Sequence, residues 1–172
     1  RHHHRSHAGR VDHRLLRERR FDLRGARDIL DVGSGAGQIA KHLLKYADPA
    51  ARITCCDLSP EMLRRARNRL KNPLPTHVAA DLARLPFADE SFDCVTCGYV
   101  LKHLDDGGAR ALLIEVRRVL EPGGLAVIWE FGPTGNPRLD AWNARVLAAG
   151  VARPRLRSSA TLRRLATEAG FP

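Results

Sequence analysis

The sequence alternates short apolar runs with longer stretches of amphipathic character. Five runs have the length and composition of strands: residues 28–32, 52–56, 76–80, 92–97 and 125–130. Three stretches between them show helical spacing of apolar residues: 37–47, 59–70 and 108–120. Because strands that alternate with helices favour right-handed crossovers, we predict an α/β, doubly wound, mostly parallel sheet with helices on both faces.

The length of 172 residues is typical of one domain with a sizeable core. An amphipathic helix over residues 11–24 leads into it, so we predict a basic N-terminal arm and helix (1–26) followed by a ligand-binding domain (27–172). No apolar stretch approaches the ~18–20 residues that cross a bilayer. We therefore expect no membrane span and a cytoplasmic protein.

The net charge of +10 is concentrated near the start of the chain. Residues 1–27 hold nine arginines against three acidic residues, a pattern that can bind nucleic acid. However, arginine outnumbers lysine along the whole chain, and aromatic residues do not alternate with the basic ones as base stacking requires. We therefore disfavour nucleic acid as a partner.

The four cysteines lie in two of the strand-like runs, as Cys55–Cys56 and Cys94–Cys97. A C-x-x-C spacing invites a zinc or redox interpretation, but residues three apart on a strand point to opposite faces. No second C-x-x-C or H-x-H follows. We predict reduced core cysteines and no metal site.

A glycine-rich loop, DVGSGAG (Asp31–Gly37), joins the first strand to the next helix. Its glycines allow a sharp turn and a close approach of ligand to backbone, and the first helical N–H groups can face an anionic group. The spacing is G-x-G-x-G rather than the dinucleotide G-x-G-x-x-G, and no Gly-Lys-Ser/Thr of a P-loop follows. Asp31 would repel a pyrophosphate but suits a ligand with an ammonium and a sulfonium. The loop alone favours S-adenosylmethionine and leaves a nucleotide open.

Two further aspartates end the second and third strands. The loops after parallel strands, residues 33–37, 57–60, 81–86 and 98–104, meet at one edge of the sheet, where such folds bind ligands. Asp57 can accept hydrogen bonds from both ribose hydroxyls there, and Asp81 can accept a hydrogen bond from the adenine amino group. Dehydrogenases also place an acid at the position of Asp57, so this pair predicts an adenosine ligand without naming it.

Four segments together resemble one family: ILDVGSGAGQIA, CCDLSPEML, AADLARLPFADESFDCVTCGYVLKHL and LEPGGLAVIWE. They are similar to class I S-adenosylmethionine-dependent methyltransferases with a Rossmann-like fold, especially the ubiquinone/menaquinone-biosynthesis type and its small-molecule relatives. The resemblance covers residues 27–132 and the tail LRRLATEAGF.

The resemblance implies a role for each matching residue. Asp31, Gly33, Gly35 and Gly37 would hold the methionine part of the cofactor, with Ser34 and Gln38 as neighbours, and Gly98 would contact the amino-acid moiety through its backbone. Asp57 would bind the ribose. Leu58 and Met62 would pack against adenine, and Asp81 and Leu82 would read its amino edge.

The activity that the resemblance implies is in-line transfer of the sulfonium methyl to a small-molecule O, N or C atom, leaving S-adenosylhomocysteine. Tyr99 and His103 are the candidate bases beside the fourth strand. The alternatives are an RNA or protein methyltransferase that uses the arginine-rich arm, a non-catalytic S-adenosylmethionine-binding protein, and an NAD-dependent oxidoreductase.

The C-terminal part departs from the family pattern. Family members continue with a helix and an antiparallel strand pair, whereas residues 133–157 are short and the chain stops at AGFP. The pair is missing, which leaves LAVIW as an apolar edge strand. Incomplete sequence, a homo-oligomer partner or divergence would each explain this, and we favour an incomplete sequence.

Overall fold

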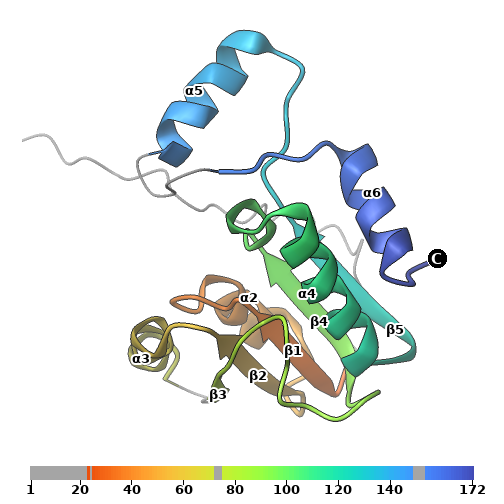
Figure 1. Cartoon of the computed structure of the whole chain (residues 1–172). Helices are drawn as coiled ribbons and strands as arrows, with labels where there is room; N and C mark the ends of the chain where they lie inside the picture. The colour runs from red at the N-terminus through yellow and green to blue at the C-terminus, as the bar shows by residue number, and fades with distance from the viewer. Residues whose placement is uncertain (1–22, 24, 72–74, 149–153) are drawn as a thin grey trace, which may run out of the picture.

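A computed structural model of the chain describes residue 23 and residues 25–71, 75–148 and 154–172. Its centre is a five-stranded parallel sheet in the order β3-β2-β1-β4-β5 (Figure 1). The strands are β1 (Asp28–Val32), β2 (Arg52–Asp57), β3 (Thr76–Ala79), β4 (Phe92–Gly98) and β5 (Leu120–Trp129). The order places the first strand in the middle, as a doubly wound fold requires.

The helices cover both faces of this sheet. They are α2 (Gln38–Tyr46), α3 (Pro60–Arg69), the short 3₁₀ helix η1 (Leu101–His103), α4 (Asp106–Val119), α5 (Pro137–Ala148) and α6 (Ser159–Glu168). Helices α2 and α3 pack on one face, and α4 and α6 pack on the other. α5 stands apart from these layers (Figure 1). The predicted α/β architecture is therefore confirmed, while the predicted helix over 11–24 lies outside the described residues except for Leu23, which is buried and not helical.

The alternation of side chains along each strand builds two separate apolar layers. On β1, Leu30 and Val32 pack toward α4 and α6, whereas Ile29 packs toward α2. The cysteines follow the same alternation, since Cys94 lies in the α2 layer and Cys97 in the α4 layer. All four cysteines are buried and free of disulfides, in agreement with the prediction of core cysteines.

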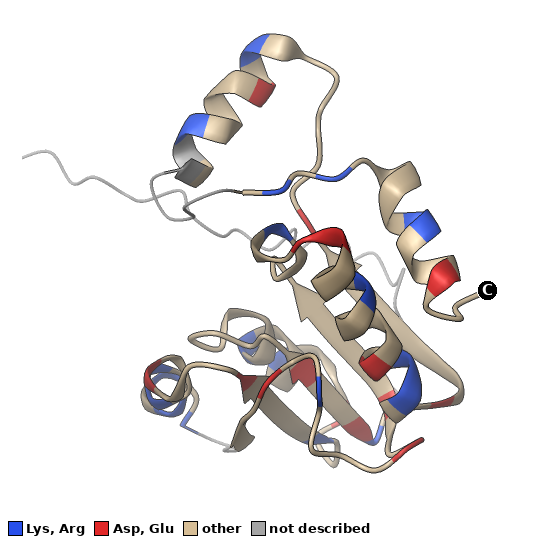
Figure 2. Ribbon diagram, in the orientation of Figure 1, with Lys and Arg blue, Asp and Glu red and all other residues tan. Residues whose placement is uncertain are grey.

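Helix α3 is amphipathic, and its apolar side packs on the sheet. Leu63 and Ala66 are buried, while Arg64, Arg67 and Arg69 are exposed. Figure 2 shows that α3 carries several basic residues. An amphipathic helix of this length gains most of its stability from packing its apolar stripe. Ser59 caps its first turn by accepting the Met62 N–H at 3.3 Å, and Pro60 occupies the first position, as the sequence predicts.

The passage from α4 to β5 differs from the sequence prediction. The expected turn at residues 121–124 lies within β5, which begins at Leu120. Pairing steps from Phe92–Leu120 to Cys94–Leu125, so four residues of β5 stand opposite Asp93. An irregularity of this kind interrupts a ladder without ending the strand, and propensity does not reveal it. β5 lies at the end of the strand order within the described sheet, as expected for LAVIW.

A buried arginine ties the C-terminal segment to the body of the fold. The Arg157 side chain is 4% exposed, and its guanidinium donates to the carbonyls of Leu101 (2.6 Å) and Leu104 (2.7 Å) and to Asp106 (3.0 Å). These bonds join the segment before α6 to η1 and to the first turn of α4. Arg157 therefore fixes the segment that follows β4.

Arg157→Leu should lower the free energy of unfolding by about 3 kcal/mol, because two carbonyls lose their buried donor. Arg164→Leu is the matched control, since Arg164 also contacts Asp106 but is half exposed, and it should cost about 0.5 kcal/mol. Urea denaturation measures both. Equal losses in the two variants would contradict the anchoring role of Arg157.

Candidate functional site

The glycine loop after β1 is bonded to the end of β2. The N–H groups of Gly33 and Ser34 donate to the Cys56 carbonyl at 2.7 and 3.0 Å, and the Gly35 N–H donates to Asp57 Oδ2 at 2.8 Å. Asp57 Oδ1 accepts the Ser59 N–H at 2.8 Å. The structure thus brings together the glycine loop and the acidic residue that the sequence placed at one edge.

The loop is closed on one side and open on the other. Gly33 has φ +67°, and an added Cβ would lie 2.1 Å from Val100 Cγ2 in the loop that follows β4. Gly35 has φ +52°, yet a Cβ there would meet nothing within 4 Å among the described atoms. The loop therefore packs tightly against its neighbour at Gly33 and leaves free space at Gly35. Gly37 is the N-cap of α2 and has no side chain to accept a hydrogen bond, so the first N–H groups of this helix are not capped by a side chain.

Asp31 is fully buried at the end of the central strand. Its Oδ1 accepts the Thr96 hydroxyl at 2.8 Å, but no described donor bonds Oδ2. The pKa of Asp31 is raised to about 7, mainly because burial disfavours the charged carboxylate and to a lesser extent because of the charge of Asp57, whereas the Thr96 hydroxyl and the Ala40 backbone N–H oppose the rise. The Ser34 hydroxyl is also buried; it lies beside the Cys55 thiol but makes no well-formed hydrogen bond in the described part of the chain. Among the described residues, Asp31 Oδ2 and Ser34 Oγ are therefore left without hydrogen bonds, which is rare in a native interior.

Two large apolar side chains are exposed beside Asp57. Leu58 is 68% exposed and Met62 is 36% exposed, although both belong to the first turn of α3 or the loop before it. Exposed apolar side chains next to a polar loop are typical of a surface that a ligand covers.

The third strand ends close to the same edge, because the Ala80 N–H donates to the Asp57 carbonyl at 3.1 Å. Asp81 is exposed and its Oδ1 accepts the Ala83 N–H at 2.9 Å. The Leu82 side chain packs against the α4 layer rather than toward the edge. Gln38 is exposed at the start of α2, and Gly98 backs on Ile39.

The two candidate bases follow β4. Tyr99 is half-buried, with its ring centroid 4.7 Å from that of Phe131. His103 is exposed at the end of η1, and no described carboxylate lies within ion-pair distance of its imidazole. Partial burial and the charge of Lys102 lower the pKa of His103. This shift favours the neutral imidazole, which is the form that can accept a proton.

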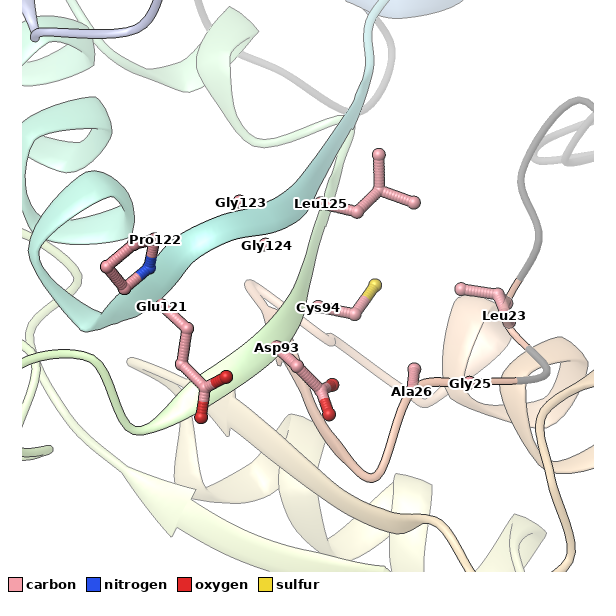
Figure 3. Close-up of a pocket in the computed structure, with 10 residues that line it drawn as sticks. All are labelled: Leu23, Gly25, Ala26, Asp93, Cys94, Glu121, Pro122, Gly123, Gly124 and Leu125. Carbon is pink, nitrogen blue, oxygen red and sulfur yellow. The ribbon is translucent and has the colours of Figure 1, made fainter.

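A hollow lined by Asp93, Cys94 and Leu125 lies at the opposite end of the sheet, where β4 and β5 begin (Figure 3). None of the predicted site residues lines it. Within the described ranges, no three His, Cys, Asp or Glu side chains are grouped so that they could hold a metal, and no helix is both long and apolar enough to cross a membrane.

Sequence reasoning missed Thr96 and Lys102. Thr96 bonds Asp31 because β4 pairs with β1 in a register that sets these two residues side by side. Lys102 is 7% exposed between the ends of β4 and β5. No motif or spacing assigns either residue to the site, because their contacts depend on which strands are neighbours.

The sequence is similar to known methyltransferases. The methyltransferase domain family matches residues 30–128. The ubiquinone/menaquinone biosynthesis C-methyltransferase UbiE of Desulfotalea psychrophila is 40% identical over 109 residues, which cover 63% of this chain and 43% of that protein. The UbiE of Pseudomonas putida is 33% identical over 142 residues, 77% of this chain and 54% of that protein.

A solved structure shows the same architecture. The S-adenosylmethionine dependent methyltransferase from Mesorhizobium loti is 26% identical, with a TM-score of 0.68 over 92% of this chain and 79% of that one. The match to the UbiE proteins spans about half of their length. The family match runs from Leu30 in β1 to Ile128 in β5 and so covers more than half of this chain. The chain therefore belongs to the methyltransferase domain family.

Proposed function

We propose that this protein binds S-adenosylmethionine at the glycine loop and transfers its methyl group to a small-molecule acceptor. The observation that carries the proposal is the pair of buried, unpartnered polar atoms, Asp31 Oδ2 and Ser34 Oγ, beside the open side of Gly35. A ligand ammonium would supply the missing donors, which a pyrophosphate cannot.

The remaining residues of this edge fit the other parts of the cofactor. Asp57 and Asp81 would accept hydrogen bonds from ribose and adenine, and exposed Leu58 and Met62 would pack on the adenine ring. The backbones of Leu82 and Gly98 and the side chain of Gln38 complete the predicted set. Bound S-adenosylmethionine supplies an electrophilic methyl on sulfur, and the chain must chiefly align an acceptor with it.

The test is transfer of labelled methyl from S-adenosylmethionine to phenolic, quinone and amine acceptors, with bulk RNA and a protein mixture as further acceptors. We expect S-adenosylhomocysteine to form with a small molecule. Binding without transfer would favour a non-catalytic protein, and label on RNA or protein alone would favour the macromolecular alternative. Absence of S-adenosylmethionine binding would overturn the proposal. Homo-oligomer formation and a cytoplasmic location stay predictions from the sequence.

Leu58→Ala should weaken S-adenosylmethionine binding about tenfold, because an exposed side chain that packs on adenine loses its apolar contact. Stability should change little, since Leu58 is exposed. Ile114→Ala on α4 is the control, being also apolar and 45% exposed, and should bind normally. Calorimetry measures both affinities, and equal values in the two variants would argue against an adenine contact at Leu58.

Affinity for S-adenosylmethionine should rise about tenfold from pH 5.5 to 7.5, because a cationic ligand favours ionised Asp31 and its pKa is about 7. Below this pKa, binding must release the proton of Asp31; above it, the affinity levels off. Asp31→Asn should bind more weakly and show no such rise. The same raised pKa makes the ligand-free fold lose stability as pH rises from about 4 to 7. A parallel rise in Asp31→Asn would assign the pH dependence to another group.

We further propose that His103, or alternatively Tyr99, accepts a proton from the acceptor. His103→Ala should lower kcat about 100-fold and leave cofactor affinity unchanged if the imidazole is the base. The lowered pKa of His103 predicts that activity persists below pH 6.5. His77→Ala on β3 is the control, because the pKa of His77 is also lowered by burial. Unchanged turnover in His103→Ala would leave Tyr99 as the candidate.

A further inference from the structure

Tyr99 adopts a backbone conformation that a bulky residue rarely takes. Its φ is +62°, in the left-handed region, immediately after β4 ends. Such a conformation persists only where surrounding contacts hold it, and it often marks a functional site. One such contact comes from β5, because the Tyr99 N–H donates to the Trp129 carbonyl at 2.7 Å.

The other side of this strained residue is held by Lys102. The Lys102 ammonium donates to the Tyr99 carbonyl and lies 5.4 Å from the Tyr99 ring centroid and 5.7 Å from that of Phe131. The Lys102 side chain is buried, and no described carboxylate lies within ion-pair distance of its ammonium, although the charge of Glu130 acts on it from farther away. A buried ammonium without an ion pair is unfavourable unless carbonyl and aromatic contacts offset its lost hydration.

The backbone around Lys102 is also fixed on both sides. Glu130, directly after β5, accepts the N–H of Lys102 at 2.9 Å and the N–H of Phe131 at 2.9 Å. The Lys102 carbonyl accepts the Arg155 N–H at 2.9 Å. The ammonium therefore reaches Tyr99 from a backbone that the loop after β5 and the segment before α6 hold in place.

We infer that Lys102 is a positioning residue for Tyr99, one of the two candidate bases that would act on the methyl acceptor. Its ammonium holds the Tyr99 carbonyl so that Tyr99 keeps its left-handed backbone, and with it the ring that stacks on Phe131. The inference rests on the proposed methyl transfer for its functional meaning, because Tyr99 is one of the two candidate bases. It assigns to Lys102 no contact with acceptor or cofactor.

The experiment uses the two tyrosines of the chain, Tyr46 and Tyr99. Selective ¹³C,¹⁵N-tyrosine labelling gives one set of NMR signals for each, with Tyr46 as the internal reference. In Lys102→Met we expect the Tyr99 Cα and Cβ shifts to move to values typical of negative φ. The ring-current shift from Phe131 should also be lost, while the Tyr46 signals stay in place. Lys102→Arg, which keeps the charge and the donors, should retain the Tyr99 signals.

Lys45→Met is the matched control, because the Lys45 ammonium lies 5.2 Å from the Tyr46 ring centroid. It should move only the Tyr46 signals. Phe131→Leu should remove the ring-current shift of Tyr99 and keep its Cα shift, which separates ring stacking from the backbone restraint.

Unchanged Tyr99 signals in Lys102→Met would overturn the inference. A shift of both the Tyr46 and the Tyr99 signals to random-coil positions in that variant would also overturn it, because Lys102 would then support the whole fold. Calorimetry on the same samples measures S-adenosylmethionine binding, which Lys102→Met should leave unchanged. A wild-type protein that keeps the Tyr99 signature but binds no S-adenosylmethionine would contradict the proposed function and leave the positioning role standing.

Discussion

The pairing of β1 with both β2 and β4 is the constraint on which the site depends. Each residue from Ile29 to Val32 has a partner on either side, so the strand is held in a fixed register at the middle of the sheet. Because all five strands run parallel, the loops that follow them leave at the same edge. The bonds from Gly33, Ser34 and Gly35 to the end of β2 follow from this arrangement.

The same central position creates the main electrostatic tension of the molecule. A side chain on β1 that points toward α2 is buried, and Asp31 occupies such a position. Burial of a carboxyl favours its neutral form, and the hydrogen bonds from the Thr96 hydroxyl and the Ala40 backbone N–H offset only part of that penalty. A sequence selected only for stability would place an apolar residue there. Asp31 therefore breaks a local rule of core composition at the place where the proposed ligand charge would lie.

The two halves of the sheet edge that carries the site are shaped by different groups. On the β1–β2 side, backbone N–H groups and the carboxylate of Asp57 define the geometry, and glycines keep the loop open. On the β4–β5 side, side chains define it, through Tyr99, Lys102 and Phe131.

Much of the fold was readable from local patterns. Each of the five predicted strands is present, and the helices that follow the first two begin within one residue of their predicted starts. Period-two alternation also placed Cys94 and Cys97 on opposite faces of β4 correctly. The start of β5 was wrong, because Glu121–Gly124 reads as a turn while tertiary pairing with β4 carries it into the strand. α5 and the anchoring by Arg157 were not predicted.

The sequence by itself determined the strand–helix alternation, the loop DVGSGAG and the acids that end β2 and β3, because these features depend on residue spacing along the chain. Only the tertiary structure decided that Thr96 partners Asp31, that no described donor bonds Asp31 Oδ2, and that the Lys102 ammonium donates to the Tyr99 carbonyl. Those properties arise from the order of strands and the crossing of loops between distant segments. Burial and pairing between such segments are set by packing in three dimensions, and no local pattern contains them.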